Sequence, residues 1–287
     1  MSLMSLFSKA GLRACFFWCL ASTSAFVLAQ ASSTAAASSG QTVSAVGYTG
    51  LGLTPSPRPA EWGEVAMGFQ NTIPGASKPK GYNFLMSVGV LPGVEINGRL
   101  ATQDLQCNLY GLGDNPCREP IDRDLAASFK FGHSVELENG WRVSASIGTT
   151  DYGGAATFNR ATYGVAGADK GSWSLALGYG KASRSGSPLK GAFGQLAWRP
   201  WDEVQLYSEW LDRRAYAGFQ AFLPAKFSPE NTRFYVGAMR QMHGAPGIVQ
   251  RQSLSAGVTV QLDKPPAAKM PVKAWVPEPM KIGRAHV

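Results

Sequence analysis

The stretch "YNFLMSVGVLPGVEINGRL", residues 82–100, contains two alternating segments that flank a Pro-Gly pair. In both segments, large apolar residues recur at every second position, which places them on one face of a β-strand. A Pro-Gly pair favours a tight turn. The stretch therefore predicts two antiparallel strands, each with one apolar face. The apolar positions are Tyr82, Phe84, Met86, Val88 and Val90 in the first segment, and Val94, Ile96 and Leu100 in the second.

The same alternation recurs along most of the chain. It is clear in "EVAMGFQ" (64–70), "LAASFKF" (125–131) and "LSAGVTVQL" (254–262). Because a period of two is the strand signal, we predict an all-β chain. About twelve strands are predicted, near 63–71, 82–91, 93–102, 124–133, 141–149, 161–168, 172–181, 191–199, 203–212, 215–223, 232–240 and 251–262.

The strand faces indicate where the strands lie. Charged residues form only 16% of the chain, and the polar faces carry mainly Ser, Gly and Ala. A soluble β-sandwich turns its apolar faces inward and exposes charged faces. A transmembrane barrel instead turns apolar faces to lipid and polar faces to a lumen. We therefore predict a transmembrane antiparallel up-and-down β-barrel of the outer-membrane type.

The connections between the predicted strands mostly alternate between long and short. Residues 72–81 and 103–123 are long connections, whereas the Pro-Gly turn and residues 169–171 are short. Outer-membrane barrels have long outer loops and short periplasmic turns. Strand ends on the predicted periplasmic side carry tryptophans, which is typical of an aromatic girdle at a membrane interface; ordinary core tryptophans are the alternative. The girdle candidates are Trp62, Trp141, Trp173, Trp198 and Trp201.

The last predicted strand carries a short pattern that resembles the signal by which outer-membrane barrels are recognised by their assembly machinery. Its residues are Ser255, Gly257, Val260 and Leu262. The barrel region is accordingly assigned to residues 47–262. Residues 263–280 are Pro-rich and predict an extended periplasmic linker.

The final residues, 281–287 ("KIGRAHV"), can be encoded by what looks like the start of a common sequencing adaptor. We interpret them as a sequencing artefact at the end of a C-terminally truncated gene, and a natural tail of this sequence is the alternative. Without Lys281 and Arg284, and without Lys9 and Arg13 of the leader, the formal charge of +8 falls to +4. That charge is too small to indicate a nucleic-acid partner.

The N-terminus has the pattern of a secretory signal peptide, assigned to residues 1–29. Lys9 and Arg13 precede an apolar run that ends in the small-residue pattern Val27-Leu28-Ala29. A signal anchor is the alternative. The pattern predicts Sec export to the outer membrane of a Gram-negative bacterium. Residues 30–46 are Ala/Ser-rich and are predicted to be disordered.

Two cysteines follow the leader, Cys107 and Cys117. An exported chain meets an oxidising compartment, so we expect a disulfide between them. Closing such a short loop would stabilise the fold by about 2–3 kcal/mol.

The stretch "GYTGLGLTPSPRPAEWGE", residues 47–64, is rich in glycine and proline. A phosphate-binding loop would need a following helix, and a polyproline ligand for a partner is a second alternative. Because a strand follows, we interpret the prolines as a stiff periplasmic lead-in and the glycines as points of close approach to barrel backbone.

Charged residues on the polar faces, together with the uncharged Gln205, are the candidates for the lumen lining. They can form a structural network, or they can line a path for a hydrated solute. The candidates are Glu64, Glu95, Arg99, Lys130, Arg142, Gln205 and Glu209.

Catalytic constellations are sparse, and no cofactor or metal site is predicted. His133 and His243 are expected at opposite rims of the barrel. Ser134 adjoins His133 but should face the other side of its strand. We therefore predict that the protein is not an enzyme, and an outer-membrane lipid hydrolase is the least favoured alternative.

Several of these segments resemble the YjbH family of Gram-negative outer-membrane proteins. The segments are "GLGLTPSPRPAEWGEV", "VGVLPGVEINGRL", "DRDLAASFKF" and "GTTDYGGAATFNRATYGVAG", within residues 47–262. The chain has Pro57 where the family usually has alanine, and family members are usually much longer.

The resemblance implies a non-catalytic role in the export or surface assembly of exopolysaccharide or capsule. The expected partners are outer-membrane lipid, the barrel assembly machinery, exopolysaccharide and polysaccharide-export proteins. Tyr110 and Tyr152 are candidates for stacking on sugars near the outer rim. A general diffusion or structural porin is the alternative function.

Overall fold

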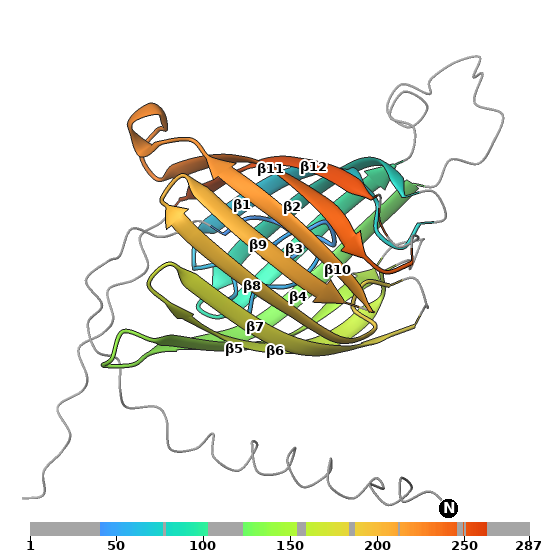
Figure 1. Ribbon diagram of the computed structural model, residues 1–287, viewed down its shortest axis with the longest axis horizontal. Coiled ribbons are helices and arrows are strands. Elements are labelled where there is room, and N and C mark those ends of the chain that lie inside the picture. The colour runs from blue at the N-terminus through green and yellow to red at the C-terminus, as the bar shows by residue number, and fades with distance from the viewer. Residues whose placement is uncertain are drawn as a thin grey trace, which may run out of the picture. The chain divides into compact units, whose positions relative to one another are not determined.

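The protein forms a closed barrel of twelve antiparallel strands, in which each strand pairs with the next and β12 pairs with β1 (Figure 1). The computed structural model describes residues 41–76, 79–102, 123–153, 159–183, 187–211, 213–245, 249 and 251–262. The strands are β1 (Glu64–Thr72), β2 (Lys80–Leu91), β3 (Val94–Thr102), β4 (Arg123–Glu136), β5 (Arg142–Gly153), β6 (Ala161–Lys170), β7 (Trp173–Ala182), β8 (Gly191–Trp201), β9 (Val204–Leu211), β10 (Arg214–Phe222), β11 (Thr232–His243) and β12 (Gln252–Gln261).

All twelve strands predicted from the alternation are present, and the barrel prediction is confirmed. The predicted hairpin at the Pro-Gly pair is formed by β2 and β3, which pair from Leu91↔Val94 to Tyr82↔Thr102. A short 3-10 helix, Ala225–Phe227, lies between β10 and β11. No helix in the part of the chain described above is long and apolar enough to cross a membrane.

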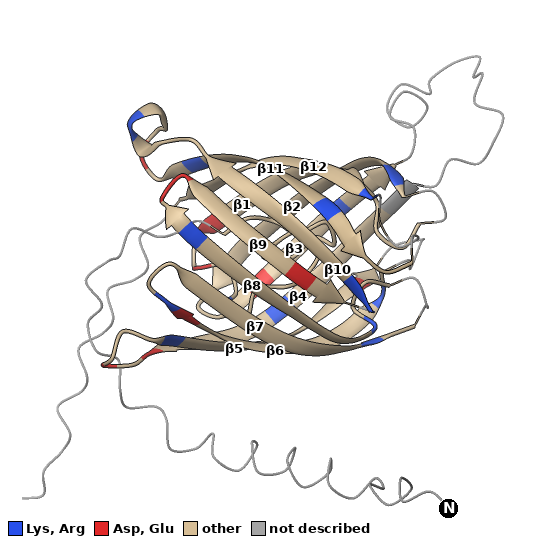
Figure 2. Ribbon diagram, viewed as in Figure 1, with Lys and Arg blue, Asp and Glu red and all other residues tan. Residues whose placement is uncertain are grey.

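The outer face of the barrel is apolar, as the alternation predicts. In β2, Tyr82, Phe84 and Met86 are exposed, whereas the residues between them are buried. Figure 2 shows that charged residues are sparse along the middle of the strands. Exposed apolar residues include Met67, Ile96, Leu125, Phe131, Ile147, Leu177, Leu196, Phe219, Val236 and Leu254, so that they encircle the barrel.

Inward-facing aromatic rings lie over glycines on the neighbouring strand. At each of these glycines, a Cβ atom would approach a ring atom to within 2.2–2.6 Å. A larger residue would therefore displace the ring, which explains why glycine stands at these inward positions. The pairs in register are Tyr163–Gly148, Phe193–Gly178, Tyr207–Gly218 and Tyr235–Gly257.

Residues 41–63 are here called the luminal segment. Residues 41–60 lie inside the barrel, where Figure 1 shows them as a blue loop behind the strands, and residues 61–63 are partly exposed and lead into β1. This corrects two predictions. Residues 41–46 belong to the stretch that we expected to be disordered, yet they are buried; residues 30–40 lie outside the described part. The Gly/Pro-rich stretch is not a lead-in outside the barrel. Small residues let the segment fit in the lumen, and the wall supplies partners for its backbone.

Candidate functional site

The luminal segment enters and leaves the barrel at the same end. This end, here the tryptophan end, carries Trp141, Trp173 and Trp201 and lies at the left in Figure 1. The carboxylate of Glu64, at the start of β1, accepts hydrogen bonds from the backbone N–H groups of Gln41 and Glu61, each at 3.1 Å. One glutamate therefore fastens both ends of the segment.

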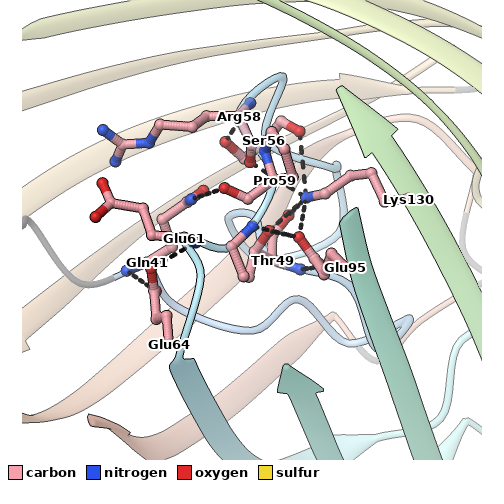
Figure 3. Close-up of polar contacts among 10 residues, drawn as sticks. Gln41, Thr49, Ser56, Arg58, Pro59, Glu61, Glu64, Glu95 and Lys130 are labelled. Carbon is pink, nitrogen blue, oxygen red and sulfur yellow. Dashed lines mark hydrogen bonds and ion pairs between the residues drawn. The ribbon is translucent and has the colours of Figure 1, made fainter. Parts of the chain in front are cut away.

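A buried ion pair holds the middle of the luminal segment (Figure 3). Lys130 Nζ lies 2.9 Å from Glu95 Oε2, and both side chains are fully buried. The carboxylate of Glu95 accepts hydrogen bonds from the backbone N–H of Thr49 at 2.8 Å and from that of Ala60 at 2.7 Å. Lys130 donates to the carbonyl oxygen of Thr49 at 3.0 Å. The wall pair is thus satisfied by the segment, as a buried pair must be.

A second buried carboxylate, Glu209 on β9, holds the far side of the luminal segment. Its oxygens accept hydrogen bonds from the backbone N–H groups of Leu53 at 3.0 Å and Thr54 at 2.8 Å. The hydroxyl of Thr54 lies 2.6 Å from Gln195 Oε1 on β8. Consecutive N–H groups that point at one carboxylate form a strong, charge-assisted contact.

Apolar packing supplements these polar contacts. Tyr48 and Leu53 are buried in one cluster with wall residues, and the ring of Tyr48 lies 5.4 Å from that of Tyr163. The Tyr48 hydroxyl donates to the carbonyl oxygen of Leu53 at 2.6 Å. Burial raises the pKa of Tyr48 well above its ordinary value, and the charge of Glu209 raises it further, so the phenol stays protonated as a donor. The barrel's core is therefore its lumen, shared by wall and segment.

The structure places the predicted lumen residues on the inner face. Glu64, Glu95, Arg99, Lys130 and Glu209 are buried. Nη2 of Arg99 lies 3.9 Å from Oδ2 of Asp151. Arg142, at the tryptophan end, is only partly buried and pairs with Glu136.

The sequence did not reveal the partner of these charges, which is the luminal segment. The glycines of the luminal segment were the sequence feature that indicated close packing against the barrel. A Cβ at Gly52 would lie 2.6 Å from Met239 Sδ and 3.0 Å from the Tyr207 hydroxyl. This is the close approach to the barrel that the glycine-rich stretch predicts.

A pocket of about 240 Å³ opens between the luminal segment and the wall. Ser56, Pro57 and Arg58 of the segment form one side. The wall side consists of residues near the tryptophan end of β5 to β10. They include Arg142, Asp169, Ser172, Ser174, Gln195, Arg199, Gln205, Gln220 and Phe222, and Gln41 of the segment also lines the pocket.

The girdle candidates gather at one end of the barrel. Trp141, Trp173, Trp198 and Trp201 are exposed, and the rings of Trp173 and Trp198 stack with centroids 5.6 Å apart. Trp62 is partly exposed and lies two residues before the start of β1. Their placement at a membrane interface stays a prediction, and so does the side of the membrane that this end faces.

The residues of the predicted assembly signal occupy the closing strand. Ser255, Gly257 and Val260 lie in β12, and Leu262 follows it as an exposed residue. Packing also explains why glycine stands at position 257, because a Cβ atom there would collide with the ring of Tyr235. Cys107 and Cys117 lie outside the described residues, as does Tyr110, whereas Tyr152 is exposed in β5.

The catalytic candidates do not meet. His133 is exposed near the tryptophan end of β4, whereas His243 ends β11 at the opposite end. Ser134 faces inward and hydrogen-bonds Ser144 at 2.8 Å. Within the described ranges, no group of three or more His, Cys, Asp or Glu side chains could hold a metal ion.

Comparison with known proteins gave structural neighbours only. No protein-family model and no curated protein match the chain. The chain is similar to the KdgM porin, with 12% identity and a TM-score of 0.43 over 69% of this chain and 98% of the porin. It is also similar to outer membrane phospholipase A from Escherichia coli, with 10% identity and a TM-score of 0.38 over 70% and 93% of the two chains. The NanC porin gives 14% identity and a TM-score of 0.36 over 70% and 99%. The fold assignment therefore rests on this chain's own strand pairing.

Proposed function

We propose that this protein is an outer-membrane β-barrel whose lumen is closed by its own luminal segment, and that it supports the export or surface assembly of an exopolysaccharide or capsule. It does so as a non-catalytic component. The closed lumen is supported by the luminal segment itself, which the buried side chains of Glu64, Glu95, Lys130 and Glu209 hold inside the barrel. The polysaccharide role is supported by the resemblance to the YjbH family.

The apolar outer face supports a membrane location. Exposed side chains such as Ile147, Leu177 and Val236 would form a large apolar surface in water, which soluble proteins avoid. The same surface is what a barrel presents to lipid. The expected binding partners in the membrane are therefore lipid and, during biogenesis, the barrel assembly machinery.

The luminal segment argues against a general diffusion porin. Such a porin has a water-filled, polar lumen, whereas here the interior contains Tyr48, Leu53, Phe193 and Leu211 in one apolar cluster. A solute would have to displace residues that make buried hydrogen bonds to the wall. A scaffold or assembly role does not need an open lumen.

The resemblance to the YjbH family supports the link with polysaccharide. The stretch "GLGLTPSPRPAEWGEV", which carries much of that resemblance, overlaps the luminal segment. The family features and the lumen filling therefore fall on the same residues. Polysaccharide-export proteins are the proposed partners. A lipid hydrolase is disfavoured, because His133 and Ser134 face opposite sides of β4.

Two measurements test the proposal. Deleting the gene should change the amount or composition of surface polysaccharide, and the full chain supplied in trans should restore it; an unchanged surface would contradict the polysaccharide role. In planar bilayers the purified full chain should show no steady conductance. A stable open channel would instead support the porin alternative.

A further inference from the structure

We propose that the pocket between the luminal segment and the wall at the tryptophan end binds an acidic sugar unit, a hydroxylated ring that bears a carboxylate or a phosphate. The inference rests on the proposed polysaccharide role and names the ligand class for it. Arg58, Arg142 and Arg199, from the luminal segment, β5 and β8, supply the positive charge.

The charge of the pocket favours an anion. Three arginines line it, and Asp169 is the acidic residue among the lining side chains. Arg142 is also bound to Glu136, whose side chain is half exposed at the rim. Arg58 and Arg199 line the same pocket, so their like charges share one space. A bound anion would offset these charges, because guanidinium groups bind carboxylate and phosphate with strong hydrogen bonds.

The position of Arg199 is fixed. Its Nη2 donates to Gln205 Oε1 at 2.6 Å. Its guanidinium lies 5.2 Å from the centre of the Phe222 ring, and Arg233 lies 4.0 Å from that ring centre. A cation held by a hydrogen bond and an aromatic ring is preorganised, so little entropy is lost when a ligand binds.

Polar atoms in the pocket lining lack partners in the described protein. They are Nε of Arg199, a donor, and Oε1 of both Gln41 and Gln220, two acceptors. Each of these atoms is buried, and a buried unpaired polar atom is costly. Their residues line the pocket, so a ligand that both accepts and donates hydrogen bonds offers partners to these atoms once the side chains turn toward it. An acidic sugar offers both kinds of partner, through its anionic group and its ring hydroxyls.

The uncharged lining fits the same ligand. Ser172, Ser174 and Gln205 add hydroxyl and amide groups. Such side chains recognise ring hydroxyls through hydrogen bonds. The lining also has an apolar part, formed by Leu51, Leu175, Ala197 and Phe222, against which the faces of a sugar ring can pack. The combination of arginines with amides and hydroxyls therefore points to a charged sugar rather than to a lipid.

The test compares sugars that differ only in charge. The purified full chain in detergent is titrated with glucuronic acid, glucose, glucose 6-phosphate and acetate, with saturation-transfer NMR and calorimetry as readouts. Glucuronic acid or glucose 6-phosphate should bind roughly tenfold or more tightly than glucose, because of charge-assisted hydrogen bonds. The relative affinities of these two acidic sugars distinguish carboxylate from phosphate. Equal binding of charged and neutral sugar, or of acetate and the acidic sugars, would overturn the inference.

Variants locate the site. Arg199→Gln should weaken acidic-sugar binding by roughly tenfold, and Arg142→Gln, at the partly exposed rim, should weaken it less. Arg240→Gln is the control, because Arg240 is exposed on β11 and does not line the pocket. Circular dichroism checks that each variant keeps the barrel. If Arg199→Gln and Arg142→Gln fold and bind as the unchanged chain does, the site is wrong.

The outcome separates this inference from the proposed function. Arginine-dependent binding together with unchanged surface polysaccharide after gene deletion would leave the site standing and remove the polysaccharide role. Altered polysaccharide together with no selective binding would remove the site alone.

Discussion

Glu209 illustrates how one buried side chain can position a whole segment. Its carboxylate is the acceptor for two consecutive backbone N–H groups, those of Leu53 and Thr54. A neutral amide at this position would keep the volume but would lose the charge and would add donors that need acceptors. The orientation of the luminal segment therefore depends on a few individual charges.

We predict that Glu209→Gln loosens the luminal segment while the barrel remains folded. Backbone amides near Leu53 and Thr54 should exchange with deuterium at least about tenfold faster, because each charged hydrogen bond contributes about 1.5–3 kcal/mol. Hydrogen-exchange mass spectrometry of the full chain measures this. Glu136→Gln, at an exposed site, is the control, and equal exchange in both variants would contradict the anchoring role.

The glycines that lie under inward-facing aromatic rings allow a second prediction about single residues. A methyl group at Gly218 would lie 2.4 Å from Cζ of Tyr207, whereas nothing lies within 4 Å of the corresponding position at Gly98. Gly218→Ala should lower the free energy of unfolding by about 1–3 kcal/mol through overpacking. Gly98→Ala should be neutral or slightly stabilising. Urea unfolding in lipid vesicles compares them, and equal midpoints would show that the ring moves away without cost.

At the scale of elements, the luminal segment acts as a plug. Removing residues 41–60 should convert a non-conducting barrel into a channel, because those residues fill the lumen that the strands enclose. Planar-bilayer recordings of the two proteins make the comparison. The double variant Glu95→Gln with Glu209→Gln keeps the segment but weakens its fastening, and we expect intermittent opening. Silent recordings from both altered proteins would contradict the plug.

The elements differ in how far the sequence predicts them. The strands can be predicted from the alternation of apolar and polar residues alone. The inward positions of Glu95 and Lys130 can be predicted in the same way, because successive residues of a strand point to opposite faces. The luminal segment shows no periodic pattern of apolar residues. Its backbone groups form hydrogen bonds with side chains far away in the sequence, as Thr49 does with Glu95, 46 residues further along the chain. Contacts of that kind exist only after the barrel closes. The pocket likewise forms only after barrel closure, because Arg58 of the luminal segment and Arg199 of β8 then line one space.

For the whole molecule, we predict that the apolar outer face is in contact with lipid. Ile147 in β5 and Phe227 in the 3-10 helix are both 65% exposed, yet only Ile147 lies in the middle of a strand. Ile147→Arg should lower folding stability in vesicles by about 2–4 kcal/mol, the cost of arginine near the bilayer midplane. Phe227→Arg should have little effect. Equal and small effects would indicate that water, rather than lipid, surrounds the barrel.

Because the luminal segment enters and leaves at one end, it forms an insert that is not threaded through the barrel. The seam between β1 and β12 can close first, and the insert can dock afterwards, since no chain end has to pass from one rim to the other. Maturation can then proceed in two separable steps, with a transient hollow species between them. In this hollow species, before the luminal segment docks, the interior of the barrel would be accessible to solutes.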